Sequence, residues 1–495
     1  MNAATQAPGW FARWVARHRR WVGLWVVLAI AFASTGDTGM GVQLLTLALV
    51  PGLLATVWAA VSPAGYERRV AGPFRRWGWR RRVRRGWIGL AESCGLTGTV
   101  QVVRRRDGRR VTESKTIAPR LRKVRTRGHL LELTIRARAG QTVEDVDDAA
   151  PRLASTLAAV AHRTRPISGG GSGCTTVVEL VMADALTTDT TAIEPEPRAV
   201  CDRVRLGHAQ GGGEWSLTIR GRHTLVAGCS GAGKGSVLWG ICCGLAPAVR
   251  ADVVRLWGVD LKRGVELAMG SGLFSAHAYT PADALDVLKA LMGVIDERGR
   301  AMAGTTRLHE PVVGDPLHVL VIDELAALTA YADVSIRRDA ERLLSEILTQ
   351  GRALGVVVVA CVQDPRKDVV AMRGLFTQTV ALRLRSPEET SMVLGDGMTP
   401  VAPAHRISPA YPGTAWVVED TGAADRVRAD YWPDDLIRDL STRYGTTVRV
   451  DTTPPPAPVD DVPGPARATN ERKPRPPRAP RAPRSVDPDL AEGAA

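Results

Sequence analysis

The stretch HTLVAGCSGAGKGSVLWG, residues 223–240, decides the fold of this 495-residue chain. Gly228, Gly233 and Lys234 match the pattern Gly-x-x-x-x-Gly-Lys-[Ser/Thr], in which backbone N–H groups cradle phosphates and the lysine reaches the β and γ oxygens. The next position departs from the pattern, because Gly235 lacks the hydroxyl that helps to hold Mg²⁺ and Ser236 comes one place late. The predicted ATP-binding residues are Gly228, Cys229, Ser230, Gly231, Ala232, Gly233, Lys234, Gly235 and Ser236, and Ser236 is also a candidate Mg²⁺ ligand.

Two further apolar strands deliver polar groups to the same predicted site. LHVLVIDELAAL, residues 317–328, ends in Asp323 and Glu324, and the carboxyl end of such a strand lies beside the phosphate loop in a doubly wound sheet. We expect Asp323 to hold Mg²⁺, directly or through water, and Glu324 to orient and deprotonate the attacking water. The strand GVVVVACVQ, residues 355–363, delivers Gln363 to this edge, where its amide can sense the γ-phosphate.

Phosphoryl transfer also needs positive charge on the developing oxygens, commonly from an arginine of a neighbouring subunit. Arg352, just before the third strand, is the first candidate, and Arg383 and Arg385 come next. The predicted catalytic residues are therefore Glu324, Gln363 and Arg352.

Apolar strands alternate with helices from about residue 200 to 450. Because the strands are apolar along their length, we expect a parallel α/β sheet that is buried on both faces and flanked by helices. The strands are HTLVAG, VVRLWGVD, LHVLVID, GVVVVACVQ, TVALRL and TAWVVE.

A different pattern precedes this unit. In residues 86–195, alternating strands such as LLELTIRARAG surround one helix, TVEDVDDAAPRLASTLAAVA, which predicts a small α+β domain. DALTTDTTAIEPEP, residues 184–197, is typical of a linker. The Pro- and Arg-rich residues after Thr452 cannot bury a core and are predicted to form a disordered tail.

Two apolar runs near the N-terminus, about residues 21–35 and 40–61, predict a transmembrane hairpin. The second run is long enough to cross a bilayer, since about 20 helical residues match a hydrocarbon core of about 30 Å. Arginines precede the first run and follow the second. Both termini are therefore expected in the cytoplasm and the protein in the cell membrane.

Positive charge is concentrated next to this hairpin. The formal net charge of the chain is +14, yet residues 63–138 alone contain 22 Lys/Arg against 5 Asp/Glu. Anionic lipid is the favoured partner of the segment from Arg68 to Arg85, ahead of DNA, with Trp77, Trp79 and Trp87 at the depth of the lipid headgroups. Seven cysteines without C-x-x-C spacing predict neither a zinc site nor a disulfide framework.

Five stretches between about residues 200 and 420 resemble the FtsK/SpoIIIE family of membrane-anchored DNA translocases, especially actinobacterial transfer proteins. They are RGRHTLVAGCSGAGKGSVLWG, GVDLKRGVEL, HVLVIDELAAL, GRALGVVVVACVQDPRKD and LRLRSPEETSMVLGDG. The resemblance implies a RecA-like motor with a mostly parallel sheet and helices on both faces. It also implies a homo-oligomeric ring, usually a hexamer, that threads double-stranded DNA while hydrolysing ATP with Mg²⁺. Asp260 and Lys262 match the family's D-x-K motif, which places them near the site or the pore.

The sequence thus predicts six parts. They are a basic cytoplasmic N-terminus (1–20), a transmembrane hairpin (21–62), a basic juxtamembrane segment (63–85), a small α+β domain (86–195), the ATPase motor (196–452) and a disordered tail (453–495).

The favoured function is ATP-driven transfer of double-stranded DNA, for a conjugative plasmid or an integrative element. Two alternatives stay open: a protein-translocating secretion ATPase of the same superfamily, and a non-hydrolysing membrane tether that grips DNA through its arginines. Gly235 leaves two possibilities for the metal. Either a locally shifted turn brings Ser236 to Mg²⁺, or a water takes the place of the hydroxyl.

Overall fold

A computed structural model describes most of the chain. The described residues are 54–106, 109–166, 174–366, 370–418 and 424–450. By its internal contacts the chain divides into Met1–Thr452 and Thr453–Ala495. The predicted segments 1–20 and 453–495, and most of the predicted hairpin 21–62, lie outside the described residues. Within the described part, no helix combines the length and the apolar character needed to cross a bilayer.

Helices lead into the first folded unit. Residues 54–61 are helical, and α3 (Pro63–Tyr66), a π-helical turn (Glu67–Ala71) and α4 (Gly72–Ser93) follow. α4 continues through Gly86, where the sequence suggested a boundary. Val83 and Trp87, four residues apart on one face of α4, are both buried, and the Trp87 indole N–H donates to the Pro119 carbonyl at 2.7 Å. The expectation that Trp87 lies at headgroup depth is therefore wrong, because the helical spacing directs it into the protein core.

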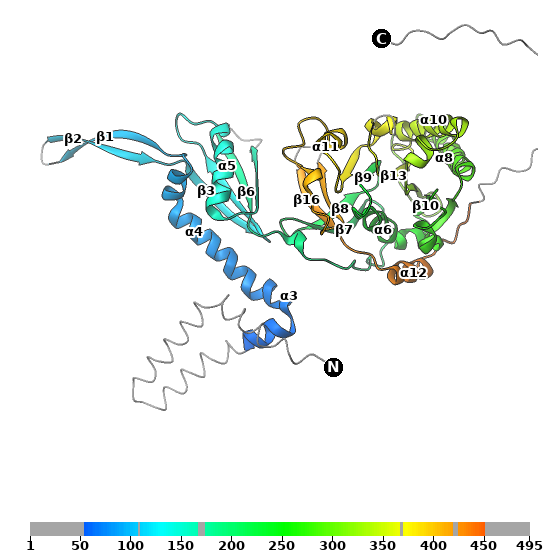
Figure 1. Cartoon of the computed structure of the whole chain (residues 1–495), viewed down its shortest axis with the longest axis horizontal. Coiled ribbons are helices and arrows are strands. Elements are labelled where there is room, and N and C mark those ends of the chain that lie inside the picture. Colours follow the sequence, from blue (N-terminus) through cyan, green and yellow to red (C-terminus); the bar gives the residue numbers. More distant parts are fainter. Residues whose placement is uncertain (1–53, 107–108, 167–173, 367–369, 419–423, 451–495) are drawn as a thin grey trace, which may run out of the picture. The chain divides into compact units, whose positions relative to one another are not determined.

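A four-stranded antiparallel sheet, a separate two-stranded sheet and two helices form the small α+β unit, and Figure 1 labels α4, α5, β1, β2, β3 and β6. The elements after α4 are β1 (Gly98–Arg106), β2 (Arg109–Ile117), β3 (Arg120–Arg127), β4 (Leu130–Arg136), α5 (Val143–Leu157), β5 (Ala161–Pro166) and β6 (Thr175–Val181). The four-stranded sheet has the order β3-β4-β6-β5, and β1 and β2 form the two-stranded sheet. α5 begins at a capping box in which Thr142 and Asp145 bond each other's backbone N–H. Buried residues of α4 and α5 pack against β4 and β6 in one core.

The motor unit contains ten strands in the described residues. The strands are β7 (Arg203–Ala209), β8 (Glu214–Thr218), β9 (Thr224–Ala227), β10 (Val254–Val259), β11 (Phe274–Ala278), β12 (Leu317–Ile322), β13 (Val356–Val362), β14 (Gln378–Ala381), β15 (Thr414–Val418) and β16 (Ala424–Ala429). The α-helices are α6 (Lys234–Gly244), α7 (Ala246–Arg250), α8 (Pro281–Met302), α9 (Ala326–Thr329), α10 (Val334–Gln350), α11 (Pro387–Leu394) and α12 (Asp434–Arg443). Short 3₁₀ helices lie at Ala185–Thr187, Leu267–Leu273, Ala371–Leu375 and Ala404–Arg406.

The ten strands form one mixed sheet in the order β11-β10-β12-β13-β9-β14-β15-β16-β7-β8. Neighbouring strands are parallel from β11 to β14 and antiparallel from β14 to β8. All six predicted strands are present. Five of them lie in the parallel half, but β15 lies in the antiparallel half, so the expectation of a parallel sheet holds only in part. β15 is half-exposed at its end, as antiparallel strands commonly are.

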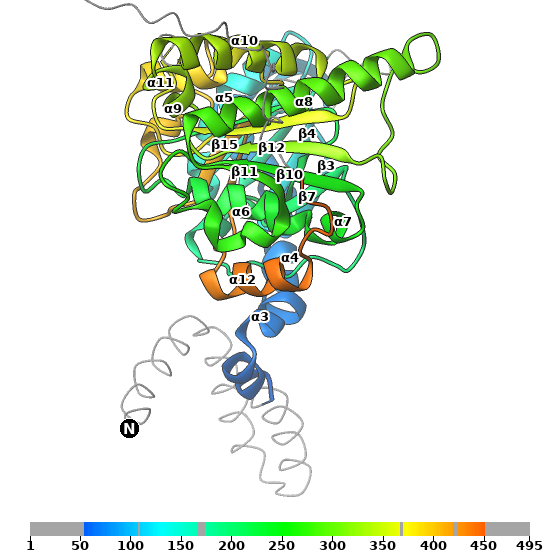
Figure 2. The same ribbon diagram turned by 90° about the vertical axis from the view of Figure 1, so that its right-hand side faces the viewer.

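Helices cover both faces of this sheet, as Figure 2 shows for α8 and α10 on one side and α6 and α12 on the other. β12 shows how the sequence produces these two layers. All six of its residues are buried. Val319 and Val321 belong to the core that includes α6, whereas Leu320 and Ile322 belong to the core that includes α8 and α10, because successive strand residues point to opposite faces.

The N-terminal part of the predicted linker is docked on β16. Arg428 of β16 is only 3% exposed, and its guanidinium donates to the Leu186 carbonyl at 2.8 Å and to the Pro412 carbonyl at 3.0 Å. It also pairs with Asp189 of the linker. These bonds fix part of residues 184–197 against the motor sheet.

Candidate nucleotide-binding site

The glycine-rich loop lies at the carboxyl end of β9, between the parallel neighbours β13 and β14. Its turn uses positive φ angles of 71° at Gly231 and 96° at Gly233, which residues with a side chain rarely adopt. α6 begins directly after it at Lys234. The Lys234 ammonium donates to the carbonyls of Gly228 at 2.8 Å and Cys229 at 3.3 Å. Strand, loop and helix therefore have the order that phosphate binding requires.

Neighbouring segments hold the backbone of this loop. The Gly228 N–H donates to the Val362 carbonyl at 3.0 Å, and the Cys229 N–H donates to the Arg383 carbonyl at 2.9 Å. The shape of the loop is therefore supported from β13 and from the segment after β14.

Gly413 closes the loop from another direction. Its N–H donates to the Ala232 carbonyl at 2.9 Å. A Cβ placed on Gly233 would lie 2.2 Å from the same Gly413 nitrogen. Close backbone approach and positive φ thus both require glycine at position 233.

Asp323 and Glu324 directly follow β12. β12 pairs with β13, and β13 pairs with β9, the strand that leads into the glycine-rich loop. Both carboxylates are buried, at 8% and 7% exposure. The Gln363 backbone N–H donates to Glu324 Oε1 at 3.3 Å, so the end of β13 meets the end of β12. Burial raises the pKa of Glu324, and the opposing effects of Lys262 and of the Gln363 N–H do not offset it. Glu324 therefore has the character of a carboxylate that can accept a proton.

Lys262 connects the two carboxylates. Its ammonium lies 2.8 Å from Asp323 Oδ2 and 3.6 Å from Glu324 Oε2. Burial opposes the charge of Lys262, but the hydrogen bond and the charge of Asp323 outweigh it and raise the lysine pKa. By contrast, burial lowers the pKa of Lys234 despite the nearby Glu324 and Asp323. Two lysines and two carboxylates thus form one electrostatic group.

The loop after β10 positions Lys262 and also brings Glu266 to the site. Asp260 is fully buried, and its carboxylate accepts the N–H groups of Lys262 at 3.0 Å, Glu266 at 2.9 Å and Leu267 at 3.0 Å. The D-x-K motif therefore has two distinct functions here. Asp260 shapes the turn, and Lys262 reaches the carboxylates.

Glu266 was not predicted as a site residue. Its Oε1 accepts the Trp239 indole N–H at 3.1 Å. Burial, followed by the charge of Asp323, raises the pKa of Glu266. The stretch GVDLKRGVEL contains the residue, but no spacing rule in the sequence shows that its side chain turns toward α6.

Gly235 and Ser236 occupy the first turn of α6. The helix is continuous from Lys234 to Gly244, so the shifted turn that could have brought Ser236 to the place of residue 235 is not formed. Ser236 points about 100° around the helix from Gly235.

The arginine candidates occupy different places. Arg352 precedes β13 and donates to the Gly221 carbonyl, before β9, at 3.0 Å. It therefore lies at the amino edge of the parallel strands, opposite the phosphate loop of its own chain. Arg383, in contrast, donates to the Ser230 carbonyl of the loop at 3.1 Å. The backbone N–H of Arg385 donates to Glu389.

The donor set fits a hard cation such as Mg²⁺. Mg²⁺ prefers oxygen ligands and is usually bound by one or two carboxylates together with substrate phosphates and waters. Asp323 and Glu324 supply carboxylates beside the loop. Among the described residues, no three His, Cys, Asp or Glu side chains converge closely enough to hold a metal by themselves. Phosphate oxygens would therefore have to complete the ligand set.

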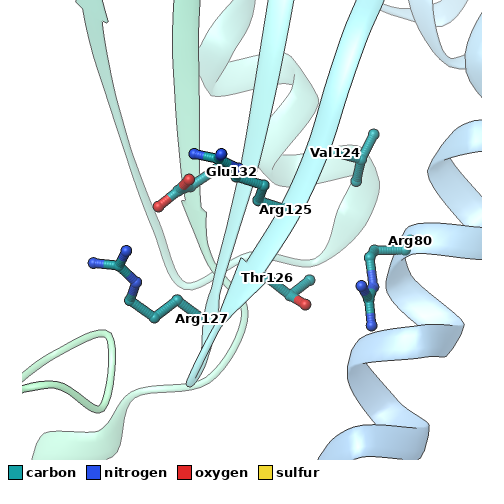
Figure 3. Close-up of a pocket in the computed structure, with 6 residues that line it drawn as sticks. All are labelled: Arg80, Val124, Arg125, Thr126, Arg127 and Glu132. Atoms are coloured by element: carbon teal, nitrogen blue, oxygen red, sulfur yellow. The ribbon is translucent and has the colours of Figure 1, made fainter.

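A second charged surface lies on the α+β unit, where a hollow of about 380 Å³ is lined by Arg80, Val124, Arg125, Thr126, Arg127 and Glu132. Figure 3 shows Arg80 extending from α4 beside the edge strand β3, which bears Arg125 and Arg127. Arg125 stands opposite Glu132 in the strand register. Three arginines against one glutamate make this hollow suitable for phosphate groups.

Two family comparisons match separate parts of the chain. Residues 205–396 match the FtsK/SpoIIIE family. The chain therefore contains an FtsK/SpoIIIE family domain. Residues 69–183 match the N-terminal domain of actinomycete conjugal transfer proteins, a span that includes α4 and the whole α+β unit.

Relatives of the family agree with these matches. The chain is 28% identical to the transfer protein TraSA of Streptomyces ambofaciens, over 70% of this chain and 87% of that protein. It is 27% identical to the DNA translocase FtsK of Borreliella burgdorferi, over 36% of this chain and 24% of that longer protein.

Two solved structures also resemble the chain. One is the pCW3 conjugation coupling protein TcpA, with 17% identity and a TM-score of 0.45, covering 66% of this chain and 94% of that one. The other is the cytoplasmic domain of the Thermomonospora curvata type VII secretion ATPase EccC, with 22% identity and a TM-score of 0.44, covering 55% of this chain and 35% of that one.

Proposed function

We propose that the chain is a membrane-anchored ATPase that moves double-stranded DNA, in the conjugative transfer of a plasmid or an integrative element. One observation carries the ATPase part. The phosphate loop with Lys234 and the carboxylates of Asp323 and Glu324 stand at one edge of the parallel strands, and Lys262 lies 2.8 Å from Asp323. The DNA part is supported by relatives that are named a transfer protein and a DNA translocase.

The proposed chemistry assigns a task to each side chain. Lys234 and the loop N–H groups bind the phosphates, and Asp323 would hold Mg²⁺ together with phosphate oxygens. Mg²⁺ supplies charge neutralisation at the transferred phosphoryl group. Glu324 takes the proton of the attacking water, which its burial favours, and Gln363 is placed beside Glu324 to respond to the γ-phosphate.

Membrane attachment and assembly are parts of the same proposal. The apolar runs of residues 21–62 would form a two-helix hairpin with both termini in the cytoplasm, because arginines flank it on both sides. The motor would assemble as a homo-oligomeric ring, a hexamer by resemblance to the family. A reporter fused after Ser62 should remain inside the cell, and a reporter found outside would contradict the hairpin.

ATP turnover of the full-length chain in lipid nanodiscs, with and without linear duplex DNA, tests the proposal. We expect duplex DNA to stimulate turnover. Lys234→Ala should abolish it, and Glu324→Gln should lower it by about 10²–10⁴-fold while nucleotide still binds. The matched control Glu297→Gln removes an exposed carboxylate of α8 and should leave turnover unchanged.

The other outcomes separate the alternatives. Turnover that does not respond to duplex DNA contradicts DNA translocation and favours transport of protein. Nucleotide binding without any turnover contradicts the ATPase and favours a tether. DNA contacts of a translocase go mainly to phosphates, so stimulation should weaken as salt rises.

A further inference from the structure

Glu266 occupies the space that a side chain at position 235 would need. A Cβ placed on Gly235 would lie 2.6 Å from Glu266 Oε1, which is closer than a non-bonded contact allows. Trp239, four residues after Gly235 and so on the same face of α6, donates its indole N–H to the same oxygen at 3.1 Å. The carboxylate therefore lies against the first turn of α6, where a serine or threonine would project its hydroxyl.

The fold holds Glu266 in this place from both ends. Its backbone N–H is bound by the buried carboxylate of Asp260 at 2.9 Å, and the next residue, Leu267, is 1% exposed in the motor core. The side chain is directed by Trp239, which is itself buried at 4% exposure. A surface glutamate that points here by chance would have neither restraint.

Glu266 also belongs to the charged group of the site. Its carboxylate interacts with the charges of Asp323, Asp260 and Lys262. Lys262 in turn is bonded to Asp323. The loop after β10, which packs Glu266 against the first turn of α6, and the end of β12 thus present carboxylates to the same region beside the phosphate loop.

We propose that Glu266 provides the oxygen ligand on the α6 side of the Mg²⁺ that accompanies ATP, directly or through one of its waters, in place of the hydroxyl that Gly235 lacks. This inference rests on the proposed function, because the site needs the metal only if it binds ATP. A carboxylate is a suitable replacement, since Mg²⁺ takes oxygen ligands and tolerates a carboxylate that acts through a bound water. The absence of a side chain at Gly235 is then what makes room for this ligand.

The decisive measurement is the Mg²⁺ requirement of nucleotide binding. A fluorescent ADP analogue is titrated onto the full-length chain in EDTA and in rising Mg²⁺, and bound Mn²⁺ is counted by electron paramagnetic resonance. Glu266→Gln keeps an acceptor for Trp239 but loses the charge. We expect it to raise the half-saturating Mg²⁺ concentration by about 10–100-fold, with binding in EDTA unchanged. The exposed control Glu297→Gln should behave as the wild type.

A swap of ligands tests the geometry. Gly235→Ser alone should be crowded by the carboxylate, whereas Gly235→Ser with Glu266→Ala gives the hydroxyl the space that the carboxylate leaves. We expect Glu266→Ala alone to raise the half-saturating Mg²⁺ concentration. The double variant should bring this concentration back toward the wild-type value. If the Glu266 variants also weaken binding in EDTA through disturbed folding, this recovery still supports the proposal and its failure overturns it.

Two remaining results have separate meanings. If the half-saturating Mg²⁺ concentration of Glu266→Gln equals that of the wild type, the proposed role of Glu266 is wrong, whereas the proposed ATPase activity is unaffected. If the wild-type chain binds no nucleotide with or without Mg²⁺, the proposed function itself is wrong, and the role of Glu266 falls with it.

Discussion

At the scale of single residues, the site is governed by the balance between burial and charge around Glu324. Burial raises its pKa, and Lys262 is the strongest of the groups that lower it again. The base form of such a carboxyl exists only above its raised pKa, so activity should fall as the pH drops through that value. Lys262 therefore sets where the acidic limb of the pH profile lies.

Lys262→Met should move this acidic limb to higher pH. The substitution removes a positive charge 3.6 Å from Glu324 Oε2, which raises the carboxyl pKa further. The profile of kcat/KM for ATP reports the free enzyme and is the quantity to measure. Lys262→Arg, which retains the charge, is the matched control. An unshifted limb in Lys262→Met would mean that Glu324 is not the base or that Lys262 does not act on it.

Glycines at 231 and 233 allow a second prediction at this scale. Both have positive φ, so alanine costs about 1–2 kcal/mol of strain at either position. Only Gly233 has a neighbour in the way, since its Cβ would meet the Gly413 nitrogen, whereas the space around Gly231 is open. Thermal unfolding should therefore show a clearly larger loss for Gly233→Ala than for Gly231→Ala. Equal losses would show that Gly413 moves aside easily.

At the scale of elements, much of the motor could be predicted from apolar runs. β9, β10, β12, β13 and β14 are buried on both faces, and a continuous apolar run is the direct signature of that environment. Asp323, Glu324 and Gln363 followed from the ends of such strands. β3, β7 and β16 escaped prediction because arginines recur through them, and edge or antiparallel strands need only one buried face.

Side chains that act across elements were harder to predict. Lys262 was placed near the site, but its ion pairs depend on the distance between the loop after β10 and the end of β12. Glu266 depends on a turn that the Asp260 carboxylate shapes, with positive φ angles at Arg263 and Gly264. Neither contact has a period or a spacing that a sequence pattern could reveal.

Arg428 provides a prediction about how elements hold together. Its buried guanidinium donates to two carbonyls and pairs with Asp189. Arg428→Ala leaves the buried acceptors without donors, which should cost about 2–3 kcal/mol of the free energy of unfolding. The control Arg438→Ala removes an exposed arginine of α12 and should change little. A cost for Arg428→Ala as small as that of the control would show that water replaces the guanidinium.

At the scale of the whole molecule, the place of Arg352 makes a statement about assembly. It lies at the amino edge of the parallel strands, away from the phosphate loop of its own chain. If it completes the site of a neighbouring subunit, Arg352→Ala and Glu324→Gln chains should each be nearly inactive alone and regain turnover when mixed. Arg383 is bonded to Ser230 of the phosphate loop in its own chain. Arg383→Ala chains should therefore not restore turnover when they are mixed with Glu324→Gln chains. No recovery with Arg352→Ala would contradict its action in trans.

Arg428 also connects the phosphate loop with the linker through a series of hydrogen bonds. The Arg428 guanidinium donates to the carbonyls of Pro412 and of Leu186 in the linker. Gly413, which follows Pro412, donates its N–H to the carbonyl of Ala232 in the phosphate loop. A displacement of the loop by phosphate can thus be transmitted by adjoining hydrogen bonds toward the α+β unit. We expect added Mg²⁺ and ATPγS to change hydrogen–deuterium exchange at residues 186–192, and Arg428→Ala to abolish that change. Exchange at β11, at the far edge of the sheet, is the internal reference. The effect of a bound nucleotide on the linker would then depend on one buried arginine.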